Sequence, residues 1–142
     1  MKLLLDTCVL AEFAKPKTDQ NVQRFIQDIA SEALFISVIS LGEINKGIHL
    51  LTTSKPKTHL QKWMKTLEMT YQHRVLPINA EIANLWGEIT ALAQKKGKTL
   101  HSADGLLAAT AIIHGLHLVT RNTKDFQHTP VLLINPWECP QE

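Results

Sequence analysis

The 142-residue sequence has little of what marks exported, membrane-bound or zinc-binding proteins. Its two cysteines, Cys8 and Cys139, follow no metal or redox spacing, and the first apolar run, Leu3–Leu5, is cut short by Asp6. No stretch approaches the roughly 20 apolar residues of a membrane span, and the seven histidines form no H-E-x-x-H pair. These absences favour a cytoplasmic protein with reduced thiols and neither a signal peptide nor a zinc site.

Excess charge and aromatic residues are also scarce, with a formal net charge of +2 and 6% aromatic residues. Such a mild basic excess permits a phosphate-rich partner without arguing for one. Four basic residues lie near the segments discussed below, and each either contacts phosphate or is ordinary solvated surface charge: Lys15, Lys17, Arg121 and Lys124. The tryptophans form no stacking series, so we expect them in the core or an interface: Trp63, Trp86 and Trp137.

Five short apolar runs are the first positive signal. They are continuous rather than alternating in polarity, which is typical of parallel strands covered on both faces. Amphipathic helical stripes lie between them, the clearest running through Ala80–Gln94, with Asn79 as its N-cap and its end near Gly97. The alternation predicts a single α/β domain over residues 1–142, a sandwich of helices around a parallel sheet. The expected strands are Lys2–Leu5, Leu34–Ser37, Val75–Ile78, His117–Thr120 and Val131–Ile134.

Four carboxylates stand out because each lies where an expected strand ends or a helix begins. They are Asp6 in LLLDTCVL, Glu43 in ISVISLGEI, Asp104 in HSADGLLAATA and Asp125 in LVTRNTKDF. If these segments end at the same edge of one sheet, several like charges are forced together, which is costly unless a cation neutralises them. Hard carboxylate oxygens with room for water suit Mg²⁺ or Mn²⁺.

Asp104 can reach this edge only if the chain returns to it. The helix over Ala80–Gln94 runs about 22 Å away from the carboxyl edge of the sheet. The seven residues Lys95–His101, when extended, span roughly 23 Å back. The helix Ser102–His114 therefore begins at the carboxyl edge, with Asp104 in its first turn.

Each acid also has an ordinary explanation when taken alone. Asp6 suits the N-cap of the following helix, and Ser40-x-x-Glu43 is a capping box that would occupy the Glu43 carboxylate. Asp104 suits the positive end of a helix dipole, and Asp125 could cap a short turn. These alternatives stay open for each residue, but the joint placement of four acids favours a site.

Short polar residues at the same strand ends could orient carboxylates or a water, with turn and cap chemistry as the alternative: Thr7, Ser37, Thr120 and Asn122. His101 lies nearest to the expected site among the histidines, and a surface role is the ordinary interpretation. The segment Thr52–Thr58 is expected to be a turn between two helices, because Pro56 disfavours helix at Lys55.

At these four motifs the chain resembles PIN-domain ribonucleases of the VapC toxin type, in the right order and from Lys2 to about Asn135. The resemblance implies a three-layer fold with strand order 3-2-1-4-5, a Mg²⁺- or Mn²⁺-dependent endoribonuclease that hydrolyses RNA, a homodimer and a VapB-type antitoxin. Carried over residue by residue, it implies an acidic metal site of Asp6, Glu43, Asp104 and Asp125, with polar support from Thr120 and Asn122. Cys8 stands where the family often has Ser or Asn, so the family's polar role at that position need not carry over.

Three rival interpretations are weighed against this one. A haloacid-dehalogenase-like phosphatase needs a second Asp two residues after the first, and Cys8 occupies that place. A receiver domain needs an adjacent acidic pair near the first strand and a Lys after the last, and neither is evident. The third rival is a PIN-like module that binds RNA or protein and has lost catalysis, although retention of all four acids argues against it.

Overall fold

A parallel five-stranded sheet forms the centre of the computed structural model, which describes residues 1–138. The strand order is β3-β2-β1-β4-β5 and every pairing is parallel, so the predicted order is confirmed. The observed strands are each as long as the predicted ones or up to two residues shorter: β1 (Leu3–Leu5), β2 (Leu34–Ser37), β3 (Val75–Leu76), β4 (His117–Val119) and β5 (Leu133–Ile134).

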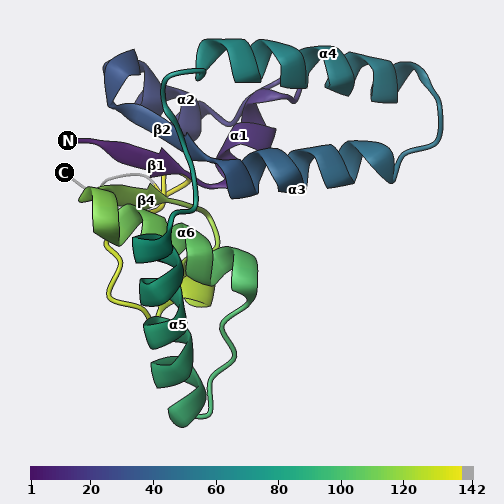
Figure 1. The fold of residues 1–142 in the computed structure, drawn as a ribbon. Helices are drawn as coiled ribbons and strands as arrows, with labels where there is room; N and C mark the ends of the chain where they lie inside the picture. The colour runs from purple at the N-terminus through teal and green to yellow at the C-terminus, as the bar shows by residue number, and fades with distance from the viewer. Residues whose placement is uncertain (139–142) are drawn as a thin grey trace.

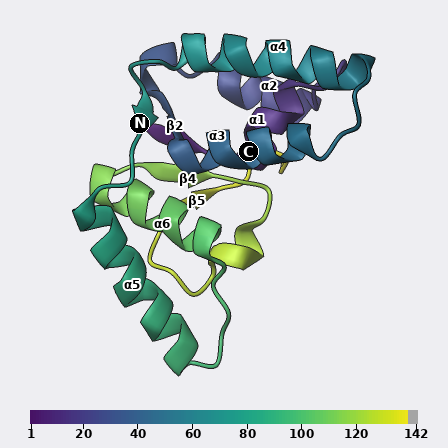
Figure 2. The same cartoon turned by 45° about the vertical axis from the view of Figure 1, so that its right-hand side comes forward.

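Helices cover both faces of this sheet (Figures 1 and 2). One face carries α1 (Thr7–Phe13), α2 (Gln20–Gln27), and an antiparallel pair of long helices, α3 (Val38–His49) and α4 (Lys55–Thr70). The other face carries α5 (Ala80–Lys95) and α6 (Ser102–His114). Two short 3-10 turns complete the chain, η1 (Ser31–Ala33) and η2 (Thr123–Phe126). Every described helix falls short of the length and apolarity that a membrane span needs.

The central strand β1 explains why its sequence is continuously apolar. Leu4 packs into the core beneath α5 and α6, whereas Leu3 and Leu5 pack into the core beneath α1–α4. Successive side chains of a strand point to opposite faces, so a strand covered on both sides must be apolar at every position. All three leucines are no more than 1% exposed, and β1 is therefore a fixed frame for the residue that follows it.

The chain returns to the carboxyl edge of the sheet after α5, as predicted. Residues 96–101 are non-helical, and in Figure 1 this segment climbs from the far end of α5 to the start of α6. Gly105 then lies so close to the Trp86 indole of α5 that an added Cβ would sit 2.7 Å from Trp86 Cδ1. This close approach seats the first turn of α6, and with it Asp104, against α5.

Two local predictions were wrong. The segment Thr52–Thr58 is not all turn, because α4 begins at Lys55 with Ser54 as N-cap, and Pro56 lies in the first helical turn. Backbone N–H groups there have no partner within the helix, so proline costs no hydrogen bond at this position. Leu92, which belongs to the apolar stripe predicted for Ala80–Gln94, is 55% exposed and so lies outside the buried face of α5. Cys139 lies outside the described residues.

Candidate active site

Asp6 follows β1 directly and is held by the next residue, Thr7, and by Thr120, which follows the neighbouring strand β4. Its carboxylate accepts hydrogen bonds from the Thr7 N–H (2.7 Å) and from the Thr120 hydroxyl (2.7 Å). The side chain is only 6% exposed. Burial raises the pKa of Asp6 even though these hydrogen bonds act to lower it. Asp6 is thus the N-cap of α1, as the ordinary explanation proposed, but the cap leaves one oxygen directed to Thr120.

Glu43 lies in the interior of α3, not at its start. The helix begins at Val38, and its N-cap is Ser37, whose hydroxyl accepts from the Ile39 N–H (3.0 Å). The predicted capping box of Ser40 with Glu43 is therefore wrong, as is the prediction that Glu43 starts its helix. The Glu43 carboxylate instead accepts a hydrogen bond of 2.6 Å from the Thr7 hydroxyl.

Thr120, the residue after β4, connects three parts of the site. Its hydroxyl is fully buried, donates to Asp6 and accepts from the Asn122 N–H (3.0 Å). Asn122 contributes through its backbone, since its carbonyl also accepts from the Asp125 N–H (3.0 Å). The predicted polar support thus has a physical basis: one hydroxyl orients the Asp6 carboxylate, and one backbone turn carries Asp125.

The pKa of Asp104 reflects the presence of the other three acids. Its pKa is raised to about 6, first because burial penalises the charged form and then because Asp6, Asp125 and Glu43 repel it. His101 acts in the opposite direction and lowers the pKa of Asp104. Asp104 therefore lies close enough to interact electrostatically with an acid 98 positions away in the chain, Asp6. We call these four residues, Asp6, Glu43, Asp104 and Asp125, the acidic cluster.

The chemistry of the acidic cluster suits a hard divalent cation, because its donors are carboxylate oxygens that repel one another. Asp6 is buried, Asp104 is half-buried and Glu43 is exposed, so the cluster opens to solvent on one side. Within residues 1–138, however, no three His, Cys, Asp or Glu side chains are arranged as a ready metal site. The residues therefore fit a cation held partly through water, and their metal-binding and catalytic roles stay predictions.

Two residues that were not predicted to support the site, Cys8 and Ser40, contact it. The Cys8 thiol lies 3.7 Å from Asp6 Oδ2 and 3.6 Å from the Thr120 hydroxyl, and it accepts from the Arg121 N–H (3.5 Å). Burial and the Asp6 charge raise the pKa of this thiol. Ser40 is fully buried with its hydroxyl 3.0 Å from that of Thr7. The one signal in the sequence for a buried role of Ser40 was its place as a polar residue on an otherwise apolar helical turn.

Comparison with known proteins adds a family to this geometry. A family model described as the PIN domain matches residues 3–132. The chain is 32% identical to Toxin FitB of Neisseria gonorrhoeae, covering 95% of this chain and 98% of FitB. It is also 32% identical to VapC ribonuclease Y4jK of Sinorhizobium fredii, covering 96% and 98% of the two chains.

Solved structures give the same picture. The structure of FitAB bound to an IR36 DNA fragment contains a chain with a TM-score of 0.90 and 31% identity, covering 98% of each chain. A toxin-antitoxin complex from Klebsiella pneumoniae contains a chain with a TM-score of 0.72 and 26% identity, covering 97% of this chain and 100% of the other.

We predict that Thr120→Val lowers the free energy of unfolding by about 2 kcal/mol, the usual worth of a hydrogen bond to a charged group. Valine matches threonine in shape but removes one of the two close donors to the buried Asp6 carboxylate, so the pKa of Asp6 should rise further. Urea unfolding near neutral pH measures the stability, and Thr120→Ser, which keeps the hydroxyl, is the control. A valine variant as stable as the serine variant would contradict this role.

We predict that Asp104→Asn stabilises the metal-free protein at pH 8, by a few degrees in Tm. The Asp104 pKa of about 6 exceeds the reference value of 3.8, so the folded state loses stability as pH rises between these values. The gain should therefore shrink as pH falls through 6 and vanish below about 4. Thermal unfolding in EDTA across this range measures it. A variant less stable than wild type at pH 8 would mean that the helix dipole outweighs burial and repulsion.

Proposed function

This chain belongs to the VapC-type toxins of the PIN-domain family, and we propose that it is a Mg²⁺-dependent endoribonuclease, the toxin of a VapBC-type toxin–antitoxin system. The observation that carries the proposal is that Thr7 bonds both Asp6 and Glu43, with Asp104 and Asp125 close enough for the acids to raise the pKa of Asp104. Four carboxylates brought together from different segments are unfavourable for folding, and a divalent cation in contact with phosphate relieves that repulsion. The relatives named as a VapC ribonuclease and a toxin support the same activity.

The acidic cluster would hold Mg²⁺, or Mn²⁺ in its place, directly or through water. When bound, such a cation stabilises the charge that develops on an RNA phosphodiester during attack by water. The chain's own residues prepare the site for it. The Thr7 N–H and the Thr120 hydroxyl each fix one oxygen of Asp6, and the Thr7 hydroxyl fixes one oxygen of Glu43. A carboxylate oxygen accepts more than one contact, so the remaining lone pairs of these oriented groups would meet the cation or its waters.

We predict that the purified protein cleaves RNA only with Mg²⁺ or Mn²⁺, and that Asp6→Asn or Asp104→Asn reduces the rate at least about 100-fold. Loss of one carboxylate weakens cation binding and removes charge from the site. Gel analysis of end-labelled RNA with and without EDTA provides the measurement. Asp28→Asn is the matched control, because Asp28 is an exposed acid at the end of α2.

Two outcomes of this assay would contradict the proposal. If wild type left RNA intact with either cation, the chain would be a PIN-like binding module without catalysis. If Asp6→Asn cleaved as fast as the Asp28→Asn control, the acidic cluster would not be the active site. The homodimer that the family resemblance implies also stays a prediction, and light scattering of the purified protein tests it.

An antitoxin of the VapB type is the partner we propose. Chains similar to this one come from the FitAB complex and from a toxin-antitoxin complex of Klebsiella pneumoniae. The acidic cluster without a cation is a strongly negative site that would accept the guanidinium fork of an arginine or a lysine ammonium. Leu50, the C-cap of α3, and the following Leu51 are 76% and 39% exposed and offer apolar contact for a helix of the partner.

We predict that one basic residue of the antitoxin accounts for most of the inhibition, because it neutralises Asp6 and Asp104. The protein encoded beside this chain is co-expressed with each of its Arg and Lys residues replaced in turn, and RNA cleavage by each complex is assayed. One replacement should restore cleavage while the complex persists. Leu50→Ala in this chain is the control for apolar contact, and it should weaken the complex. Inhibition that survived every replacement would mean steric occlusion.

A further inference from the structure

A groove of about 540 Å³ lies beside the acidic cluster, between the α1–α2 connection and the C-terminal turn. None of the four acids of the acidic cluster lines it. Its lining combines basic, acidic and amide side chains with one tryptophan: Glu12, Lys15, Lys17, Thr18, Asp19, Gln20, Asn21, Arg121 and Trp137. We call it the α1–α2 groove. Its volume is in the range of pockets that take small organic ligands.

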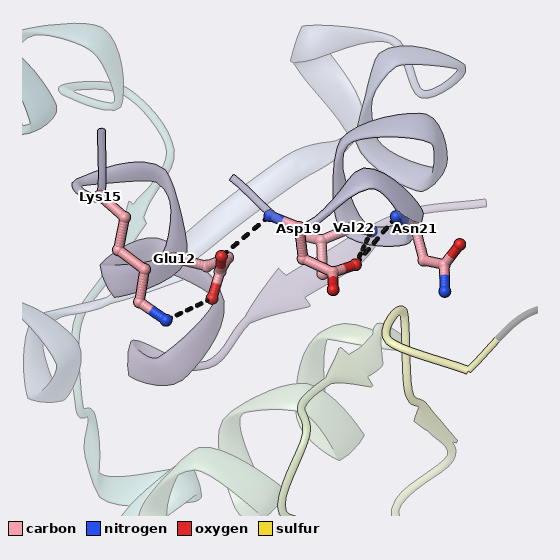
Figure 3. Close-up of polar contacts among 5 residues, drawn as sticks. All are labelled: Glu12, Lys15, Asp19, Asn21 and Val22. Carbon is pink, nitrogen blue, oxygen red and sulfur yellow. Dashed lines mark hydrogen bonds and ion pairs between the residues drawn. The ribbon is translucent and has the colours of Figure 1, made fainter. Parts of the chain in front are cut away.

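The two acids in this groove are committed to internal contacts (Figure 3). Glu12 is only 5% exposed, and its carboxylate accepts from Lys15 Nζ (2.9 Å) and from the Asp19 N–H (2.9 Å). The hydrogen bond from Lys15 lowers the pKa of Glu12. The Asp19 carboxylate caps α2 by accepting from the N–H groups of Asn21 (2.8 Å) and Val22 (3.2 Å). Both carboxylates are therefore occupied by hydrogen bonds within the wall of the groove.

The opposite wall is a stacked pair formed by Arg121 and Trp137. The Arg121 guanidinium carbon lies 5.2 Å from the centre of the indole ring. Asn21 Nδ2 donates to the Trp137 carbonyl (2.9 Å), which ties this wall to α2. Trp137 was expected in the core or an interface, and it is half-buried, packing partly against the core beneath α1–α4. Arg121 is exposed.

The α1–α2 groove is linked to the acidic cluster through Arg121. Arg121 follows Thr120, whose hydroxyl bonds Asp6, and the Arg121 N–H donates to the Cys8 thiol. A polymer with its reacting phosphate at the acidic cluster would therefore place a neighbouring unit in this groove. The four carboxylates of the cluster repel phosphate when no cation is bound, so a nucleic acid strand needs favourable contacts elsewhere.

We propose that the α1–α2 groove binds a nucleotide of single-stranded RNA next to the phosphodiester that is cleaved, an inference that rests on the proposed function. The base stacks on the Trp137–Arg121 pair, because every base presents a π-face to an aromatic or guanidinium plane. Arg121 and Lys17 contact the flanking phosphates. Lys15 is paired with Glu12 (2.9 Å), so Lys17 and Arg121 are the groove cations left for phosphate.

The test measures binding apart from cleavage, using the whole protein in EDTA. A short fluorescein-labelled single-stranded RNA is titrated, and anisotropy is followed at several salt concentrations. Lys17→Ala combined with Arg121→Ala should weaken binding about tenfold or more and reduce the salt slope by about 1.4, the worth of two phosphate contacts to a single strand. The matched control is Lys65→Ala combined with Lys95→Ala, which removes two exposed helical lysines away from the groove. This control should keep a salt slope larger than that of the groove variant.

Trp137 variants test stacking separately from charge. Trp137→Leu should weaken RNA binding by about 5-fold or more, the worth of one stacked base, whereas Trp137→Phe should retain most of the affinity. Thermal unfolding of both variants establishes that they are folded. If the leucine substitution destabilises the fold, the combined Lys17→Ala and Arg121→Ala variant still decides. The proposal then requires that this variant bind the labelled RNA more weakly than Trp137→Phe does.

The outcomes separate this proposal from the ribonuclease assignment. RNA binding in EDTA that is equal in the groove variants and the lysine control would overturn the proposal, whether or not the protein cleaves RNA. Binding that depends on the groove in a protein that cleaves nothing would support the groove and contradict the ribonuclease assignment. Groove variants that bind RNA normally but lose the partner protein would overturn the proposal in favour of a protein-docking site.

Discussion

The parallel register of β1 and β4 is the constraint on which the rest of the site depends. Leu5 pairs with Val119, and the Asp6 N–H donates to the Val119 carbonyl (3.0 Å). The next residues of the two strands, Asp6 and Thr120, therefore emerge side by side at the carboxyl edge. Because β1 is buried on both faces, this pair cannot shift without disturbing both cores. Glu43 and Asp104 then reach the same edge on α3 and α6.

This arrangement keeps charge where folding alone would disfavour it. Burial raises the pKa of Asp6 in spite of three side-chain and backbone hydrogen bonds that lower it, so hydrogen bonding does not offset the cost of desolvation. Asp104 carries the same cost together with repulsion from three other acids. A protein selected for stability alone would place smaller or neutral side chains here, and the excess charge is consistent with a site that gains its partner ion in function.

Glu12 shows that hydrogen-bond partners decide whether the pKa of a poorly exposed carboxylate is raised or lowered. Glu12 is as poorly exposed as Asp6, yet its pKa is lowered, because Lys15 and the Asp19 N–H both donate to it. Glu12 stabilises the α1–α2 connection, whereas Asp6 and Asp104 repel each other. The molecule thus sets an acidic cluster beside a groove whose acids are already paired, and Arg121 belongs to the boundary between them.

Local signals in the sequence determined most of the elements and the identity of the four acids. The strand Leu34–Ser37 and the helix Ser102–His114 were predicted to the residue, because a continuous apolar run marks the first and Gly115, in the left-handed region at φ 67°, ends the second. Where two local patterns competed, sequence reasoning failed. Ser37 and Ser40 both suit an N-cap, and only the burial of Ser40 beside Thr7 decides that Ser37 begins α3.

The tertiary structure alone decided the contacts that give the acids their properties. Thr120 and Asp6 are 114 residues apart, and Cys8 meets Thr120 across 112 residues. The α1–α2 groove likewise joins the end of α1 to Arg121 and Trp137 from the far end of the chain. Composition and periodicity report which face of an element is buried, because burial follows local patterns of polarity. The raised pKa of Asp104 and the Arg121–Trp137 stack in the groove depend on distances between side chains. Only the packing of the whole chain sets those distances.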